Sequence, residues 1–264
     1  MKRGVKVKDK RLVYTVILGG YDLLHELEFK SNNVDYICVT DDPKLLSNSW
    51  DILLIPPPVN PVETNRRYKL FPFEFFNYEE SIYVDGNLSI KGDVNFIFDK
   101  YMGKSDIAIS KHPFRTCIYD EAAVCLSVGK VSEIQVRKQM QKYTYSNFPK
   151  NYGLFENNVI IRKHSRDIAH LMEEWWTEFN LHTKRDQLSF CYVLWKNRME
   201  CTAFEEGPRY SSKYFSFQLH KKELSLPLIK RMAAIIILRQ KQNVLYFMAS
   251  WIVKNIKSLM SLTK

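Results

Sequence analysis

The stretch ESIYVDGNLSI, residues 80–90, decides how the rest of the chain is interpreted. Its β-branched and aromatic run IYV (82–84) predicts a strand that stops at DGN (85–87). Asp and Gly favour turns for backbone reasons, so this ending could be purely structural. It could also place an oxygen ligand at the carboxyl edge of a sheet, where open α/β sheets bind their ligands. The rest of the sequence must separate these two interpretations.

Strand-like and helix-like segments alternate along the chain. The apolar runs are nearly continuous, which is typical of strands buried on both faces of a parallel sheet. The sequence therefore predicts an α/β fold with a mostly parallel central sheet flanked by helices, without internal repeats or flexible linkers. Besides the strand that runs into residue 85, we expect strands at 12–18, 34–40, 50–58, 105–110 and 157–163, and helices at 165–179, capped by Ser165, and at 184–196.

Composition excludes several classes of protein. The chain has 264 residues, enough for one large domain with or without an appendage. It has only nine glycines and neither a GxGxxG nor a GxxxxGK[ST] phosphate loop. Its five cysteines are widely spaced and form no CxxC pair, which argues against a zinc site. A reduced, cytosolic setting is the simplest account of unpaired cysteines.

The net charge of +10 is concentrated at the two ends of the chain. Residues 224–264 carry +7 without any Asp or Glu and residues 1–11 carry +5, so residues 12–223 carry −2. A nucleic-acid enzyme would spread positive charge over its working face, so we expect no nucleic-acid partner. Basic ends fit an anionic lipid surface better.

Neither apolar end is long enough to be a spanning helix. The apolar stretch 12–18 is short and lacks a cleavage pattern, so it predicts the first strand rather than a signal peptide. The apolar runs 232–238 and 244–253 are separated by RQKQN, and neither reaches the roughly 18 to 20 residues that a spanning helix needs.

The tail is amphipathic, and Pro227 suits the first turn of a helix that begins near residue 225. Its polar residues recur at helical spacing and leave Trp251, Phe247 and other apolar residues elsewhere on the helix. We expect a domain at 1–223 and a basic amphipathic helical tail at 224–264 that lies in the plane of a membrane. The alternative is a pair of helices packed on the domain. The polar stripe consists of Asn243, Ser250, Lys254, Lys257 and Ser261.

Acidic residues follow three of the first four predicted strands. They are Asp22, Asp41 with Asp42, and Asp85. Each alone could be a turn residue. Together, carboxylates at one sheet edge would repel unless a hard divalent cation and sugar hydroxyls joined them.

The order of several motifs carries a resemblance that covers roughly residues 12–200. The chain resembles nucleotide-sugar-dependent glycosyltransferases of the GT-A fold, and more closely the family that includes plant mucilage-synthesis enzymes and bacterial homologues. The motifs are GGYD (19–22), TDD (40–42), Arg66-x-x-Lys69-x-x-Pro72, DGN (85–87), KHPFRTCIYDEA (111–122), GLFENNVIIRKH (153–164) and RDQLSF (185–190).

The resemblance implies a donor site with a metal ion. In such enzymes the fourth strand ends in Asp-x-Asp, whose carboxylates hold Mn²⁺ or Mg²⁺ on the diphosphate of the donor. Here Asp85 keeps its charge and Asn87 offers a neutral amide oxygen, which should weaken metal affinity. His220 would be a later metal ligand, or else a surface histidine. The implied donor-binding residues are Gly20, Tyr21, Asp41, Arg66, Lys69, Asp85 and Lys222.

Arg66 and Lys69 lie three residues apart, hence on one face of a helix. That face could stabilise the charge that grows on the leaving phosphate, or it could be a solvated helix edge.

The sugar, the acceptor and the catalytic groups are assigned in the same way. We expect His112, Arg115, Tyr119, Glu156 and Asn158 to bind sugar or acceptor. Asp186 and Gln187 are expected near the anomeric carbon or acceptor hydroxyl, although an acid at a helix N-terminus can also be a dipole effect. If the reaction inverts configuration, Asp186 or Glu121 is a candidate base, and a retaining reaction needs none.

The sequence thus predicts a metal-dependent hexosyltransferase that uses a UDP-sugar and a glycan or lipid-linked acceptor. We expect it in the cytoplasm, peripheral at the inner face of the membrane, in bacterial surface polysaccharide or lipopolysaccharide synthesis. The alternatives are a metal-dependent nucleotidyltransferase or phosphohydrolase, and a non-catalytic binding or adaptor protein of the same fold.

Overall fold

The computed structural model describes residues 11–262. The predicted basic start at residues 1–10 and Lys264 therefore lie outside the described residues, as do the side chains of Lys257 and Ser261. Within residues 11–262, no helix combines the length and the apolar content needed to cross a bilayer.

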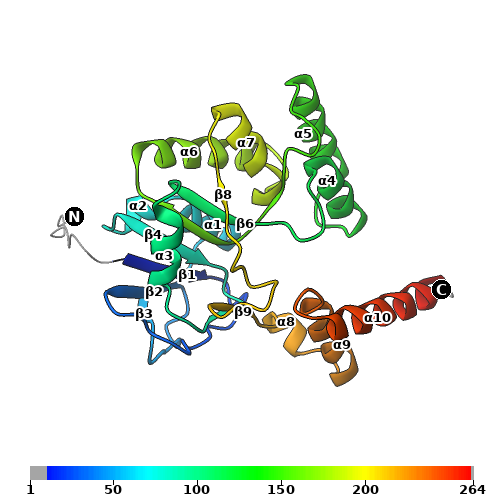
Figure 1. The fold of residues 1–264 in the computed structure, drawn as a ribbon, viewed down its shortest axis with the longest axis horizontal. Coiled ribbons are helices and arrows are strands. Elements are labelled where there is room, and N and C mark those ends of the chain that lie inside the picture. Colours follow the sequence, from blue (N-terminus) through cyan, green and yellow to red (C-terminus); the bar gives the residue numbers. More distant parts are fainter. Residues whose placement is uncertain (1–10, 263–264) are drawn as a thin grey trace.

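A seven-stranded sheet forms the centre of the protein, in the order β3-β2-β1-β4-β7-β6-β8 (Figure 1). β1, β2, β3 and β4 are parallel, and β7 runs antiparallel to both β4 and β6. A small second sheet pairs β5 with β9. The strands are β1 Arg11–Ile17, β2 Val34–Thr40, β3 Asp51–Leu54, β4 Glu80–Val84, β5 Leu88–Ile90, β6 Ile107–Lys111, β7 Phe155–Lys163, β8 Thr202–Ala203 and β9 Phe215–Phe217.

Helices cover the sheet, and two of them project from it. Figure 1 shows α6 and α7 over the sheet and the α9–α10 hairpin extending beyond α8 at the lower right. The helices are α1 Pro61–Leu70, α2 Pro72–Phe75, α3 Asn95–Met102, α4 Ile118–Ser127, α5 Glu133–Tyr145, α6 Arg166–Leu181, the 3-10 turn η1 Asp186–Leu188, α7 Phe190–Asn197, α8 Lys221–Leu224, α9 Leu228–Leu238 and α10 Val244–Leu262.

The central strands are buried on both faces, which is why their sequences are continuously apolar. On β1, Tyr14 points into one core with Trp175 of α6 and Phe190 of α7. The neighbouring Val13 points into the other core with Phe98 of α3. The mostly parallel α/β sheet flanked by helices is therefore confirmed.

The strand predictions agree with the structure at the centre of the sheet and less well at its edge. The strand expected at 34–40 is β2 with the same bounds. The strand expected at 50–58 ends at Leu54, just before Pro56, Pro57 and Pro58. Proline has no N–H to donate to a neighbouring strand, so the run cannot continue in the sheet.

The helix expected at 184–196 is wrong as a single element. It divides into η1 and α7 at Ser189, whose φ of −126° is not helical. The carbonyl of Asp186 accepts from the backbone N–H of Ser189 in a 3-10 turn at 3.3 Å and from the indole N–H of Trp175 at 2.9 Å. Pro227, expected in the first turn of a helix, stands at the N-cap of α9 instead.

Ser165 caps α6 as predicted, because its side-chain oxygen accepts from the backbone N–H of Ile168 at 3.3 Å. We expect Ser165→Ala to lower the free energy of unfolding by about 1 kcal/mol, since the first turn loses this acceptor. Urea unfolding measures the change. Thr177→Ala, at an exposed site in the same helix, is the matched control and should not destabilise. Equal losses in both variants would contradict the cap.

Candidate active site

A cavity of about 800 Å³ opens at the carboxyl ends of β1 and β4. This volume suits a small-molecule ligand. Its walls come from the end of β1, from α1, from the DGN turn after β4, from the start of β7 and from η1. Later segments close it through Arg209, His220 and Leu238.

Asp85 faces this cavity at the end of β4. Its Oδ1 accepts from the hydroxyl of Tyr83 at 2.8 Å and lies 3.5 Å from the ammonium of Lys69. Burial raises the pKa of Tyr83 well above its usual value, and the charge of Asp85 adds to the shift. Tyr83 therefore stays a neutral donor that holds the side chain of Asp85 in place.

Lys69 and Asp186 form a buried ion pair behind Asp85. The Lys69 Nζ is 2.9 Å from Asp186 Oδ2, and Arg66 Nε is 3.6 Å from the same oxygen. Burial acts to raise the pKa of Asp186, but the positive charges of Arg66 and Lys69 outweigh it and hold that pKa well below its usual range. Asp186 is thus a permanent anion that two cations neutralise.

Arg66 and Lys69 lie on one face of α1, as their spacing predicted, and both side chains line the cavity. They do not form a solvated helix edge, since Lys69 is only 1% exposed. Gln187 also lines the cavity, and its amide nitrogen donates to the carbonyl of Phe155 at 3.0 Å.

Asn87 and His220 meet on the other side of Asp85. The Asn87 Nδ2 lies 3.3 Å from His220 Nε2, and His220 Nδ1 lies 2.6 Å from Asp22 Oδ2. In the neutral ring, Nδ1–H then donates to Asp22 and the Nε2 lone pair faces Asn87. A carboxylate behind one ring nitrogen is the arrangement that orients metal-binding histidines.

Gly86 lets this turn pack tightly. A Cβ at Gly86 would lie 3.0 Å from Cγ1 of Ile17 and 3.3 Å from Cβ of Asp22. Glycine therefore fits this position because the turn packs closely against β1, and not because the backbone has a positive φ.

No set of three or more His, Cys, Asp or Glu side chains within residues 11–262 is grouped as a metal centre would require. The residues expected to hold a cation are two such side chains, Asp85 and His220, together with the amide of Asn87. Their donor types, one carboxylate oxygen, one amide oxygen and one anchored imidazole nitrogen, suit Mn²⁺ or Mg²⁺ when phosphate and water complete the shell.

Three consecutive residues at the start of β7 supply polar groups to the cavity. Glu156 accepts from Arg209 Nε at 3.0 and 3.1 Å, and burial raises its pKa despite this partner. Asn157 and Asn158 are at least nine-tenths buried, and in the described part of the chain the Asn157 amide atoms and Asn158 Oδ1 have no hydrogen-bond partner. Buried polar groups without partners are rare, so these amides are available to a polar ligand.

A bulge makes this arrangement possible. The pairing of β6 with β7 shifts between Ile109 and Ser110, which pair with Ile160 and Glu156. Bulges re-aim side chains and are common beside active sites. Asn157 was not predicted as a site residue, because strict alternation would point it away from Glu156 and Asn158.

Of the other expected donor-side residues, Tyr21 lines the cavity as predicted, whereas Gly20, Asp41 and Lys222 do not. Tyr21 is 60% exposed at the wall of the cavity. Asp41 does not line it, because both its oxygens accept from the backbone N–H of Gly19 at 3.0 Å. This contact holds the turn at Gly19 and Gly20, whose φ values are +62° and +61°. Lys222 is exposed outside the cavity, and Lys221 reaches toward Gly20 instead.

His112, Arg115, Tyr119 and Glu121 do not line the cavity. Arg115 donates to Glu121, while His112 Nδ1 accepts from the backbone N–H of Arg115 at 3.0 Å. Burial lowers the pKa of His112 to about 4. The Tyr119 hydroxyl donates to the carbonyl of Phe148 at 3.0 Å. These side chains satisfy one another and hold the segment after β6, so the structure does not bring these expected sugar-binding residues, or the expected base Glu121, to the cavity.

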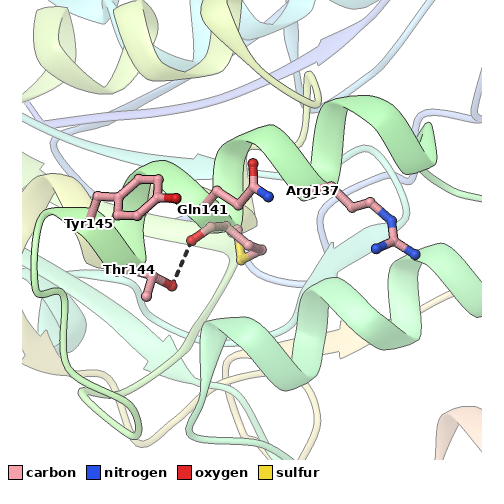
Figure 2. Close-up of a pocket in the computed structure, with 5 residues that line it drawn as sticks. Arg137, Gln141, Thr144 and Tyr145 are labelled. Carbon is pink, nitrogen blue, oxygen red and sulfur yellow. Dashed lines mark hydrogen bonds between the residues drawn. The ribbon is translucent and has the colours of Figure 1, made fainter.

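A second depression lies on the outside of α5 (Figure 2). All of its lining residues belong to this one helix, and Thr144 donates to the carbonyl of Met140 within it. A single helix face cannot enclose a ligand, so the cavity beside Asp85 is the candidate active site. The lining residues are Arg137, Met140, Gln141, Thr144 and Tyr145.

Fold and cavity together are those of an α/β protein with a polar cavity at the carboxyl edge of its sheet, where such sheets bind their ligands. The family model TOD1/MUCI70, glycosyltransferase-like domain, matches residues 64–213. The chain belongs to this glycosyltransferase-like family, which confirms the resemblance stated from the motifs. The matched residues include Arg66, Asp85 and Asp186 but stop before His220.

Solved structures of glycosyltransferases resemble this chain in outline. The apo structure of the bifunctional glycosyltransferase WbbM is 14% identical with a TM-score of 0.48, over 90% of this chain and 46% of that one. The apo form of mouse xyloside xylosyltransferase 1 is 9% identical with a TM-score of 0.47, over 76% of this chain and 87% of that one. The chain therefore spans less than half the length of WbbM. No curated protein sequence matches the chain.

We expect Lys69→Met to lower the free energy of unfolding by about 3–5 kcal/mol, because it leaves buried Asp186 without its nearest cation. Asp186→Asn added to Lys69→Met should recover part of this loss. Urea unfolding measures both. Arg137→Met is the control, since it breaks an exposed pair with Glu133 that contributes less than about 1 kcal/mol. A loss in Lys69→Met no larger than in this control would refute the buried pair.

Proposed function

We propose that the protein transfers a hexosyl group from a nucleoside-diphosphate donor, UDP-linked, to a glycan or lipid-linked acceptor. The observation that carries the proposal is the position of Asp85. It stands at the carboxyl end of a central strand, faces a cavity of about 800 Å³, and is flanked there by the cations of α1 and by His220. The glycosyltransferase-like family supports the reaction class.

The nucleotide end of the donor fits the side of the cavity near β1. Tyr21 offers an exposed aromatic face on which a uracil ring can stack. The Gly19–Gly20 turn, held by Asp41, shapes the wall beside it. Arg66 then lies where the diphosphate would run from the nucleoside toward Asp85, and its guanidinium can pair with phosphate oxygens.

Asp85, Asn87 and His220 are the residues that would hold a divalent cation, Mn²⁺ or Mg²⁺. Such an ion would neutralise charge on the diphosphate of the donor. Asp22 contributes by fixing the His220 ring, and Tyr83 and Lys69 by fixing Asp85. One carboxylate in place of two predicts modest metal affinity.

The main chemical requirement of the reaction is to stabilise the leaving group. As the bond between the sugar C1 and the diphosphate oxygen breaks, its electron pair goes to the diphosphate while the sugar becomes cationic. Arg66 and Lys69 are fixed cations at the same cavity wall and need no reorganisation to stabilise the leaving charge. Asp186 serves this step by holding both of them in position.

Asp186 and Glu121 were the expected candidates for a base, but the geometry favours Glu156, which was expected to bind sugar or acceptor. Asp186 is paired with two cations that depress its pKa, and Glu121 lies outside the cavity. Glu156 lines the cavity, its pKa is raised by burial, and Asn158 lies beside it. We therefore propose an inverting transfer in which Glu156 accepts the proton of the acceptor hydroxyl as that oxygen attacks C1.

Arg209, the unpartnered amide of Asn157 and the unpartnered Oδ1 of Asn158 would orient the acceptor or the donor sugar at the same corner. Amide groups donate to and accept from hydroxyls, which suits a polyhydroxylated ligand. They replace His112, Arg115 and Tyr119 as the proposed sugar contacts.

The cellular setting remains the one proposed from sequence. Acceptors of bacterial surface polysaccharide or lipopolysaccharide synthesis grow on the inner face of the membrane, and the basic tail, which carries no acidic residue after Glu223, suits that surface. A nucleotidyltransferase would instead release pyrophosphate, a phosphohydrolase would release phosphate, and an adaptor would turn over no donor.

Donor binding is tested by thermal shift against UDP-, GDP-, CMP- and dTDP-sugars, each with Mn²⁺ or with EDTA. A UDP-sugar at 100 times its Kd should stabilise the protein by about 2.7 kcal/mol, and the shift should be smaller with EDTA. Asp85→Ala should abolish this shift, while Asp120→Ala, at an exposed site on α4, should keep it. A UDP-sugar that binds Asp85→Ala as it binds the wild type would refute the proposed donor site.

Glu156→Gln should lower kcat by about 10²- to 10⁴-fold with little change in donor Kd, because the amide cannot take up the acceptor proton. UDP release with acceptor present measures the rate, and NMR of the product gives its anomeric configuration. Exposed Glu205→Gln is the matched control. A product that retains configuration, or a larger loss in Glu121→Gln, would rule out Glu156 as the base.

A further inference from the structure

The α9–α10 hairpin buries two polar side chains between its helices. Gln240 and Ser250 are 8% and 2% exposed. The Gln240 Oε1 accepts from Lys254 Nζ at 2.6 Å and from Ser250 Oγ at 3.5 Å. Asn243 caps α10 by accepting from the N–H of Tyr246 at 2.9 Å. Of the predicted polar stripe, Ser250 lies buried in the seam between the helices, whereas Asn243 and Lys254 remain exposed to solvent.

The apolar side of the hairpin points outward. α9 has no buried residue, and the large side chains of α10 that are opposite the seam are all more than half exposed. Soluble proteins seldom leave an apolar patch of this extent uncovered. The outward face comprises Leu228, Ile229 and Met232 of α9 and Val244, Leu245, Phe247, Met248, Trp251, Ile252 and Ile256 of α10.

The positive charge of the tail distinguishes between the possible binding partners of this outward face. Residues 224–264 carry seven Lys or Arg and no acid. A second copy of the chain would bring two such basic hairpins together, which like-charge repulsion opposes. An anionic bilayer instead offers apolar chains to the face and negative headgroups to the basic residues of the tail. Trp251 is a residue type that favours the boundary between headgroups and chains.

The hairpin is also fastened to the wall of the cavity. Leu238, at the end of α9, lines the cavity and packs on the core beside β1. The ammonium groups of Lys241 and Lys254 lie 5.0 and 5.9 Å from the ring centre of Phe114, in the segment after β6. A surface bound by the outward face is therefore close to the cavity.

We propose that the outward face of α9 and α10 inserts in the plane of an anionic bilayer and holds the cavity against it. The acceptor then reaches Glu156 on a lipid carrier from the membrane side, a part of the proposal that rests on the proposed glycosyl transfer. The insertion itself depends only on the hairpin.

Co-sedimentation of the full chain with vesicles tests the insertion. Vesicles of phosphatidylcholine with phosphatidylglycerol should bind the protein, and pure phosphatidylcholine or high salt should bind it less. Leu245→Glu with Trp251→Glu should reduce binding at least about tenfold, since two carboxylates enter the apolar layer. Leu46→Glu with Val59→Glu makes the same charge change at exposed sites elsewhere and should leave binding unchanged.

Two further readouts keep the outcomes distinct. Circular dichroism and Tm should be unchanged in both double variants, because all four side chains are exposed. Equal vesicle binding by the two variants would overturn the proposal. So would a vesicle-free dimer that Leu245→Glu with Trp251→Glu converts to monomer while vesicle binding persists, because the occupant is then a second copy.

The UDP-sugar thermal shift without lipid separates this proposal from the proposed function. Leu245→Glu with Trp251→Glu should keep the wild-type shift while losing the vesicles. A wild type that binds vesicles through the outward face but shows no shift with any nucleotide sugar would leave the membrane surface standing and refute the donor site.

Discussion

The site depends on one buried cation. Lys69 is almost fully enclosed, and its ammonium lies between the carboxylates of Asp85 and Asp186, which come from β4 and η1. Its backbone carbonyl accepts from Tyr14 on β1 and from Arg162 on β7. One residue of α1 thereby links three strands and η1 at the edge of the sheet. An unpaired charge at such a depth is costly, so these elements are held in a single arrangement.

This arrangement gives three acidic residues of the cavity different roles. Asp186 neutralises Lys69 and Arg66 and is therefore a positioning group with a depressed pKa. Asp85 shares Lys69 only at 3.5 Å and keeps a more exposed face toward the cavity, so it can still meet a ligand. Glu156 has Arg209 as its partner and a raised pKa, which leaves it the one of these three acids suited to proton transfer.

Much of the fold and part of the site could be predicted from sequence, for identifiable reasons. Continuous apolar runs marked the central strands, and the spacing of Arg66 and Lys69 placed them on one helix face. Contacts between distant segments could not be predicted in this way. Arg115 and Glu121 looked like binding residues because a polar stretch follows a strand, yet they pair with each other. The position of Asn157 depends on a bulge, which the sequence does not reveal. Arg209 lies in a segment that carries no recognisable motif.

The orientation of the tail helix α10 also could not be predicted from sequence. Periodicity correctly divided α10 into a polar and an apolar side, but it carries no information about which side meets the partner helix. In the structure Gln240, an uncharged residue in the turn, is buried and accepts from Ser250 and Lys254. The apolar side is then left outward beside basic residues. In water this exposure opposes folding of the hairpin, whereas at the proposed lipid surface it would stabilise binding, so one packing arrangement would determine both the structure of the tail and where it is stable.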